Sequence, residues 1–397
     1  CKLSLLQQGS QQLENTLTGM AQTQKRLKVY YLSISTFSDN HLNTLHHLQE
    51  RFDVVYGVII PSKRANFTEA ELKVYCDQHG IKLDAFHLAH RFRDPRNIAA
   101  YYRVIRSIQK ENPDIIYFTN FDQVYINMLF TLLGRQKVII GFHDVVNHSN
   151  TRFDFLTNIG KNVLFRFFKY FRTYSIAQEK ILLDKHPGKI VFTIPLPLMT
   201  FGPLPARSNE VKRTSFLFFG NILSYKGLDI LLKAAENLSA KRTDFTITVA
   251  GRADDWDEMY APLLTNKSIL DKQVRFIENS EVPGLFSNAD FLVLPYRDTT
   301  QSGPLMIAYN YNVPVITSTA EGFSEFVEPG ITGLSFEVNS VNDLERTLEN
   351  AINLTEDQYD SLRKSQGQFI HKHYSAKAIV DKYEHMFQHV LSIKKNL

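Results

Sequence analysis

The chain has 397 residues, of which 44% are hydrophobic and 22% charged, and its formal net charge is +4. This is the composition of a globular protein of two or three domains, and the charge is too small to indicate nucleic-acid binding. The only cysteines, Cys1 and Cys76, exclude a disulfide framework and a cysteine-based metal site. We therefore expect a cytoplasmic protein with no bound metal. No apolar run approaches the roughly 20 residues that span a bilayer.

The first half of the chain alternates between apolar strands and helices. Residues 1–26 form a polar leader, and a regular pattern begins at Leu27. Near-continuous apolar strands separated by helices indicate a parallel sheet covered on both faces, so we predict a Rossmann-like domain over 27–197. The predicted strands are 27–34, 53–60, 82–88, 114–118, 137–142, 173–178 and 189–194, and helices are expected among the intervening segments at 96–111 and 159–171.

The pattern breaks at residues 195–213, which hold four prolines and a glycine, and we assign 198–213 as an interdomain linker. A second series of strands and helices predicts another Rossmann-like domain over 214–355. Residues 356–397 have helical spacing, and we expect them to pack back toward the first domain. The second series has predicted strands at 214–220, 245–251, 273–277, 291–295 and 313–317, and helices at 227–239, 255–265, 281–288, 303–312 and 340–353.

The predicted fold class is therefore α/β, with two tandem doubly wound domains facing a central cleft. Ligands of such sheets bind outside the carboxyl ends of the strands. Ser302, Gly303 and Pro304 follow the apolar strand 291–295 and open the next helix. Ser302 is a good N-cap, and Gly303 lets the backbone approach a ligand closely. Free amides and the helix dipole at this point suit a diphosphate; the alternative is an ordinary capped helix.

Two cations stand at neighbouring strand ends. Lys226 lies just before the helix 227–239 and can reach a phosphate held at Ser302, whereas the alternative is a solvated lysine. Arg252 follows the strand 245–251 and faces the same cleft; the alternative is an ion pair with Asp254 or Asp255. The chain has neither a Walker loop nor a Gly-x-Gly-x-x-Gly motif, which weakens a dehydrogenase interpretation.

Several segments of the second domain, taken in order and spacing, resemble the nucleotide-sugar half of family 4 glycosyltransferases, which have the GT-B fold. The loop with TQSGP is similar to that of transferases of bacterial surface-polysaccharide assembly. The resemblance implies retaining transfer of a sugar from a nucleotide-diphospho-sugar to a glycan or lipid-linked acceptor, with no cofactor. The segments are FFGNILSYKG, VAGR, LPYRDTTQSGP, NVPVI and EGFSEFVEPGITGLSF.

The resemblance also implies roles for single residues. Lys226 matches the family's diphosphate lysine and is a candidate catalytic charge, and Ser302 and Gly303 match the loop whose amides hold the diphosphate. Thr299 and Gln301 stand where the donor sugar lies.

Glu325 matches a glutamate near the nucleotide ribose; its alternative role is a charge at a helix N-terminus. The chain departs from the family at the Glu-x7-Glu pair, which is replaced by Thr299 and Ile307, and at a common arginine, which is Asn221. The missing acidic pair puts the sugar and ribose contacts in question, and Asn221 leaves diphosphate binding to Lys226, Arg252 and backbone amides.

In the first domain, the strand 137–142 ends at His143-Asp144. A histidine at a strand end has a pKa suited to hydrogen bonding with a reacting sugar, so we assign His143 to the reaction centre. The alternative is a structural His-Asp pair. Asn120, Asp122 and Asn147 are the candidate acceptor-binding residues.

Residues 161–174 interleave Lys and Arg with Phe and Tyr. A basic, aromatic helix can lie on an anionic membrane, which would place the protein peripherally at the inner face. The alternative is a helix that packs its bulky face on the sheet.

Two further functions remain open because the acidic pair is absent. One is a nucleotide-sugar epimerase or hydrolase of the same fold. The other is a catalytically inert scaffold in a polysaccharide-assembly complex, which would bind no donor.

Overall fold

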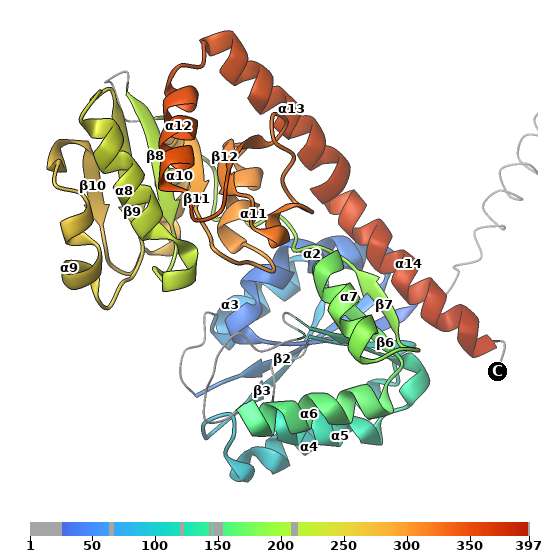
Figure 1. Ribbon diagram of the computed structural model, residues 1–397. Helices are drawn as coiled ribbons and strands as arrows, with labels where there is room; N and C mark the ends of the chain where they lie inside the picture. The colour runs from blue at the N-terminus through green and yellow to red at the C-terminus, as the bar shows by residue number, and fades with distance from the viewer. Residues whose placement is uncertain are drawn as a thin grey trace, which may run out of the picture.

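The computed structural model describes residues 26–62, 67–119, 123–142, 145, 154–207 and 213–395. Two parallel sheets, each in its own domain, organise the molecule (Figure 1). The sheet of the N-terminal domain has the strand order β3-β2-β1-β4-β5-β6-β7. The strands are β1 Lys28–Ile34, β2 Asp53–Ile60, β3 Lys82–His87, β4 Ile115–Thr119, β5 Val138–Gly141, β6 Tyr170–Thr173 and β7 Ile190–Thr193.

Helices cover both faces of this sheet because its strands are apolar on both sides. In β1, Tyr30 and Leu32 pack into one buried cluster, and Val29 and Tyr31 pack into another. The first cluster lies under α4 Ile98–Glu111, α5 Val124–Leu129 and α6 Asp154–Phe167; α7 Ile176–Lys185 also contributes to it. The second lies under α2 Asp39–Arg51 and α3 Glu69–Gln78.

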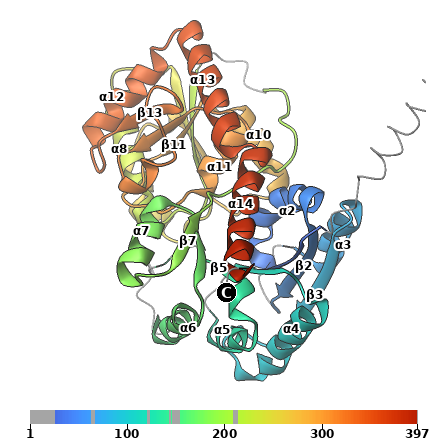
Figure 2. The same cartoon turned by 90° about the vertical axis from the view of Figure 1, so that its right-hand side faces the viewer.

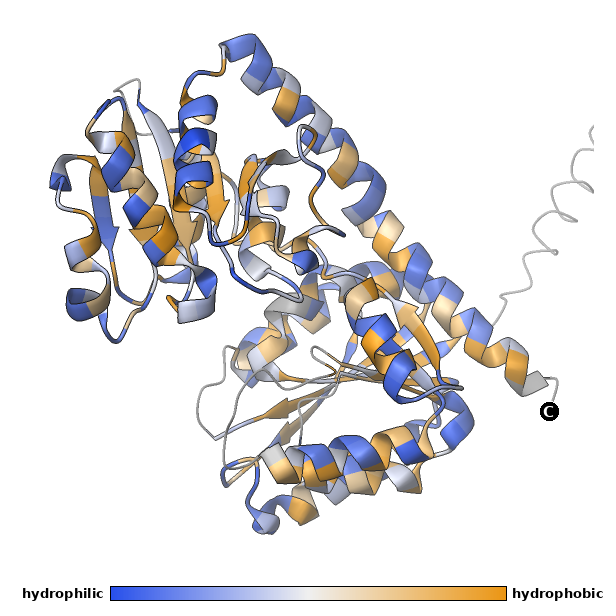
Figure 3. Ribbon diagram, viewed as in Figure 1, coloured by the Kyte–Doolittle hydropathy of each residue, from blue (hydrophilic) through white to orange (hydrophobic). Residues whose placement is uncertain are grey.

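The C-terminal domain repeats the plan with six parallel strands in the order β10-β9-β8-β11-β12-β13. Figure 3 shows its central strands as apolar and its outer helices as mixed. The elements are β8 Thr214–Phe219, α8 Leu228–Ser239, β9 Phe245–Ala250, α9 Trp256–Met259, β10 Leu270–Gln273, α10 Val282–Ser287, β11 Phe291–Leu294, α11 Gly303–Asn310, β12 Val315–Ser318, β13 Gly333–Phe336 and α12 Val341–Ile352. The predicted two-domain α/β fold is therefore confirmed.

Five details of the prediction were wrong. The helix expected at 159–171 occupies Asp154–Phe167, and the helix expected at 255–265 is reduced to Trp256–Met259. The strand expected at 173–178 ends at Thr173, since Ser175 accepts a hydrogen bond from the Gln178 amide and caps α7. The strand expected at 273–277 occupies Leu270–Gln273 instead. The short strand β13 was missed.

Two long helices, α13 Glu356–Tyr374 and α14 Ala376–Lys395, cross from one domain to the other (Figures 1 and 2). In α13, Gln366 donates to the carbonyls of Val313 and Thr332 in the C-terminal domain. In α14, Tyr383 and Phe387 are buried in the core of the N-terminal domain. The last segment of the chain thus ties the two sheets together.

The carboxyl ends of the two sheets meet near Tyr174. This residue follows β6, yet it packs in the same buried cluster as Leu294 and Tyr296 at the end of β11. Among the described helices we find none that qualifies as a membrane span.

Candidate functional site

Helix α11 starts where the sequence predicted. Ser302 has extended backbone angles, and its hydroxyl accepts a hydrogen bond from the Leu305 amide at 3.3 Å. Pro304 occupies the first turn, which needs no proline N–H. The helix therefore presents its positive end immediately after the loop that follows β11.

Lys226 lies beside this helix start. A Cβ atom placed on Gly220 would stand 3.3 Å from the Lys226 Nζ and 3.5 Å from the Pro304 Cγ, so both groups border the same backbone position. Lys226 is only 9% exposed, and its ammonium lies 5.6 Å from the centre of the Tyr296 ring. The solvated-lysine alternative is therefore wrong.

The charge of Lys226 has no counter-ion in the described part of the chain. Burial alone lowers the pKa of Lys226 to about 8, and no neighbouring carboxylate offsets this effect. A buried ammonium without an anion is costly, and a bound anion would remove that cost. The surroundings of Lys226 therefore fit an anionic ligand.

Glycines bring the strand ends of the C-terminal domain into close contact. Gly220, Gly227 and Gly251 have φ angles of 104°, 67° and 151°, which other residues rarely adopt. A Cβ on Gly227 would collide with the Pro295 carbonyl, and a Cβ on Gly251 would collide with the Gly220 carbonyl. The first contact places the end of the Lys226 turn against Pro295, where the loop to α11 begins, and the second brings the ends of β8 and β9 together.

The approach of the Gly303 backbone to a ligand stays a prediction. Its φ is not left-handed, and an added Cβ would meet the Met199 Sδ at an ordinary 3.7 Å. Close approaches of one backbone segment to another occur at Gly227 and Gly251.

Sequence reasoning missed a pair that fixes the Lys226 turn. Arg297 donates two hydrogen bonds to the Asp229 carboxylate, at 2.8 and 2.9 Å, and another to the Ser224 carbonyl at 2.6 Å. The Arg297 amide also donates to the Tyr225 carbonyl. Arg297 is visible in the sequence as the arginine of PYRD, but the sequence does not show that the fold brings it next to the Lys226 turn.

The loop expected to meet the donor sugar is packed against its own domain. Thr299 is 8% exposed, and its hydroxyl donates to the Gln301 carbonyl at 2.9 Å. Gly322 approaches the Thr299 carbonyl so closely that a Cβ would collide with it. Ile307, which replaces the second acidic residue of the family pattern, lies in the apolar cluster of the domain.

Arg252 forms the ion pair with Asp254 that the sequence analysis gave as the alternative to phosphate binding. Its guanidinium pairs with Asp254 at 3.2 Å, and both side chains are largely exposed. An exposed pair of this kind contributes little to stability. Asp254 binds the Nε and Nη2 groups of Arg252, and the exposed guanidinium has further N–H donors for a phosphate.

Glu325 joins the two domains. Its carboxylate accepts hydrogen bonds from the amides of Ile176 and Ala177, at 2.6 and 2.7 Å, at the start of α7. A carboxylate at this position stabilises a helix N-terminus by pairing with free amides and the dipole. The helix-terminus alternative is therefore what the structure shows, although the helix belongs to the other domain.

The bulky side chains of the aromatic segment 161–174 face the core of the N-terminal domain. Phe165, Phe168 and Phe171 are buried, and residues 170–173 form the strand β6 rather than a helix. The bulky face packs on the sheet, which is the alternative interpretation of this segment, and membrane contact through its exposed residues stays a prediction.

Five residues assigned to the reaction centre and the acceptor lie outside the described residues: Asn120, Asp122, His143, Asp144 and Asn147. Their roles stay predictions. The described residues contain no cluster of His, Cys, Asp or Glu that could hold a metal ion.

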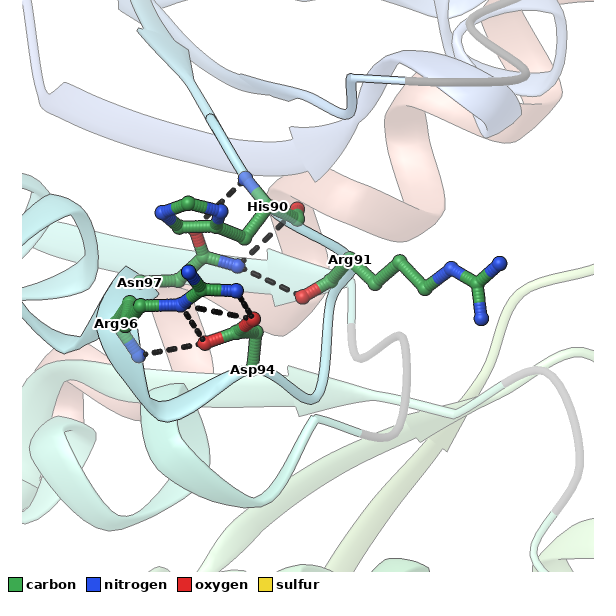
Figure 4. Close-up of polar contacts among 5 residues, drawn as sticks. All are labelled: His90, Arg91, Asp94, Arg96 and Asn97. Atoms are coloured by element: carbon green, nitrogen blue, oxygen red, sulfur yellow. Dashed lines mark hydrogen bonds and ion pairs between the residues drawn. The ribbon is translucent and has the colours of Figure 1, made fainter.

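A polar loop follows β3 at the carboxyl edge of the N-terminal sheet (Figure 4). Asn97 is 2% exposed; its side chain donates to the carbonyls of His90 and Arg91 and accepts from the His90 amide. Arg96 binds Asp94 and holds the pKa of that carboxyl below its usual range. The Arg91 side chain points away from this cluster.

Comparison with known proteins gives a family match for the C-terminal domain. Residues 213–354 match the family model described as "Glycosyl transferases group 1". An uncharacterised glycosyltransferase of Haemophilus influenzae is 24% identical over 148 residues, which are 36% of this chain. The match spans only 41% of that relative's own length.

Solved structures match nearly the whole chain. HepE from Anabaena, in complex with UDP and glucose, has a TM-score of 0.68 at 14% identity, and the match covers 91% of this chain and 99% of that one. A glycosyltransferase from Rickettsia africae has a TM-score of 0.68 at 16% identity over 92% and 99%. The lipopolysaccharide outer core galactosyltransferase WaaB, in its apo form, has a TM-score of 0.62 at 14% identity over 94% and 100%. The chain thus has the two-domain GT-B fold, with a glycosyltransferase group 1 match in its C-terminal domain.

Proposed function

We propose that the protein is a retaining glycosyltransferase that moves a sugar from a nucleotide-diphospho-sugar to a glycan or lipid-linked acceptor in surface-polysaccharide synthesis. The observation that carries the proposal is Lys226, a buried ammonium without a counter-ion beside the positive end of α11. The family match of the C-terminal domain supports it. With its two cysteines the chain suits a reducing compartment, and we place the reaction in the cytoplasm.

The chemistry follows from charge. As the bond between sugar and diphosphate breaks, negative charge grows on the leaving phosphate oxygen. Lys226 and the amides that begin α11 are fixed before the reaction, so they stabilise this charge without reorganising. The proposal assigns that stabilisation to these groups of the chain and not to a cofactor. We further propose that His143 faces the reacting sugar, and that Asn120, Asp122 and Asn147 form hydrogen bonds with the acceptor hydroxyls.

The donor side of the proposal has a ranked set of contacts. Lys226 is the principal cation, and the exposed Arg252 is a second cation whose charge is shared with Asp254. Ser302 and Gly303 supply amides, and Thr299 and Gln301 border the sugar. UDP-sugars are the first donors to test, because HepE has this fold and was solved with UDP and glucose.

A second candidate is a nucleotide-sugar epimerase or hydrolase. Thr299 and Ile307 support this candidate, because neither residue can form the acidic contacts of the glycosyltransferase pattern and Ile307 is buried. An inert scaffold would share the fold but bind no donor.

One experiment separates the three candidates. The purified chain is titrated with a panel of nucleotide sugars while its melting temperature is followed, and the binders are then incubated with and without acceptor glycans. A transferase is stabilised by its donor and releases free nucleotide mainly when acceptor is present. Equal release without acceptor would identify a hydrolase, a changed sugar an epimerase, and no stabilisation by any donor would contradict the proposal.

A further inference from the structure

Arg172, in the strand β6, is the least exposed arginine or lysine of the described residues, with 1% of its surface accessible. Among the described residues no carboxylate forms an ion pair with it, and the groups that surround its charge are tyrosines. A buried charge is costly unless other groups compensate it. The neutral groups that compensate this guanidinium therefore indicate its role.

The first of these groups are two carbonyls at the start of the segment that leads to the C-terminal domain. The Nη2 group of Arg172 donates to the Ile194 carbonyl at 2.6 Å and to the Pro195 carbonyl at 3.3 Å. Just beyond them, Leu196 and Met199 are buried in the apolar cluster of the C-terminal domain. Arg172 thus holds this segment at the point where it leaves the N-terminal sheet.

The second group is the ring of Tyr174. The Arg172 Cζ lies 3.5 Å from the centre of this ring, which is the distance of a guanidinium stacked on an aromatic face. Tyr174 packs in the same cluster as Leu294 and Tyr296 of the C-terminal domain, and the Tyr296 ring faces the ammonium of Lys226. The stacked pair therefore supports a contact that reaches the surroundings of the proposed donor site.

The third group lies on α14, the helix that returns from the C-terminal domain. The centre of the Tyr383 ring is 5.7 Å from the Arg172 Cζ. Tyr117 accepts a hydrogen bond from the Arg172 Nη1 at 3.1 Å and packs edge-on against Tyr383. Figures 1 and 2 show α14 passing beside β7. Arg172 is thus part of the surface on which α14 rests.

One guanidinium therefore contacts three segments that pass between the domains. An arginine suits this position because its planar head group has donors along its edge and a flat face on each side. Methionine has a similar length but would leave the carbonyls of Ile194 and Pro195 without this donor. Lysine would keep a donor but has no flat face to stack on Tyr174.

From these contacts we propose that Arg172 is a positioning residue that fixes the angle between the two domains. Domains of one chain ordinarily move relative to each other, and Arg172 limits that motion by joining the three segments. Lys226 and the start of α11 lie in the C-terminal domain, whereas the proposed acceptor residues belong to the N-terminal domain. The fixed angle does not depend on the proposed function; only its consequence, the alignment of donor and acceptor, rests on it.

The first part of the test needs no substrate. Small-angle X-ray scattering and differential scanning calorimetry are measured on the full chain, as wild type and as Arg172→Met. The variant should have a larger radius of gyration, because the domains are no longer held at one angle. Its two domains should unfold in separate transitions, whereas those of the wild type should unfold together.

The second part measures catalysis. Arg172→Met should bind nucleotide sugars within about threefold of the wild type, because the donor groups lie in the other domain, but its kcat should fall about a hundredfold, because the reacting groups are misaligned. Arg172→Lys keeps the charge and one donor, so both its kcat and its scattering should lie between those of the wild type and Arg172→Met.

Lys169→Met is the matched control. This exposed lysine immediately precedes β6, at the opposite end of the strand from Tyr174, and its ammonium lies 6.0 Å from the centre of the Tyr170 ring. The variant removes a cation beside a tyrosine ring without touching the segments that pass between the domains. Its scattering, unfolding and kcat should equal those of the wild type.

The outcomes separate positioning from a purely structural role. Wild-type scattering and a single unfolding transition in folded Arg172→Met would contradict the proposal, and Arg172→Lys decides in the same way if the first variant does not fold. Lower stability with unchanged scattering and kcat, or failure of both variants to fold, would show that Arg172 serves only the N-terminal core. If the wild type binds no nucleotide sugar while the scattering of Arg172→Met still changes, the proposed function fails and the positioning role stands.

Discussion

At the scale of single residues, Lys226 destabilises the free protein and stabilises the bound state. Burial lowers its pKa from 10.5 to about 8, which corresponds to at most about 3 kcal/mol of folding free energy when the lysine is charged. Lys226→Met removes the charge and keeps the length of the side chain. At pH 7 we expect the variant to be more stable to denaturant than the wild type, by up to about 3 kcal/mol, and to bind nucleoside diphosphates about a hundredfold more weakly.

The stability difference between the wild type and Lys226→Met should also change with pH, in a direction that follows from the lowered pKa of Lys226. The folded-state pKa lies below the unfolded one, so between about pH 8 and 10.5 the unfolded chain binds more protons and the wild type gains stability as pH rises. The advantage of Lys226→Met should therefore shrink over this window, as measured by denaturation at several pH values. A variant less stable than the wild type at pH 7, with unchanged nucleotide affinity, would show that Lys226 is a packing residue only.

A second residue acts on Lys226 through the turn that carries it. Arg297→Gln breaks the two bonds to Asp229 and the bond to the Ser224 carbonyl, so the turn loosens. We expect a rise in donor KM of about tenfold and a shift of the pH profile of binding toward higher pH, because a less buried Lys226 recovers its ordinary pKa. A merely structural loss would lower the amount of folded enzyme without moving the pH profile.

At the scale of elements, the glycine turns explain why the site can form. Gly227→Ala places a Cβ into the Pro295 carbonyl at a φ of 67°, and we expect a loss of about 2 kcal/mol or more together with weaker donor binding. Gly284→Ala is the matched control, because nothing lies within 4 Å of its added Cβ and the residue is in the helix α10. The control should be neutral or more stable by up to about 1 kcal/mol in urea denaturation.

Local patterns predicted elements well where the decisive interactions were local. The start of α11 followed from Ser302 and Pro304, and the alternation of apolar strands with helices predicted both sheets. The same reasoning placed a strand at 173–178, because Tyr174, Ile176 and Ala177 are apolar and the cap at Ser175 was not recognised. Contacts between distant segments could not be predicted, which is why the pairing of Arg297 with Asp229 came only from the structure, and why the structure was needed to decide that Phe165, Phe168 and Phe171 pack in the core.

At the scale of the whole molecule, several connections among the described residues join the domains: the linker, the packing of Tyr174, the crossing from α13 to α14, and Glu325. The crossing is anchored at both ends, since Arg51 binds Asp381 and Glu384 of α14 while Gln366 of α13 binds the C-terminal domain. Glu325 is a side-chain contact that reaches directly from the C-terminal domain to an N-terminal helix. It can therefore open without unfolding either sheet.

Glu325→Ala distinguishes the two roles assigned to this residue. If the contact with α7 is its main role, the variant should lose about 1 kcal/mol of stability, because two helix amides lose their acceptor, while donor affinity changes less than twofold. If Glu325 instead leaves α7 to hold the nucleotide ribose, donor affinity should fall about tenfold with stability almost unchanged. Glu328→Ala, an exposed carboxylate three residues away, should change neither quantity. Thermal melting with and without donor measures both effects in one experiment. Because the contact joins the domains, a loss of both stability and donor affinity would mean that donor binding depends on the interdomain arrangement of this structure.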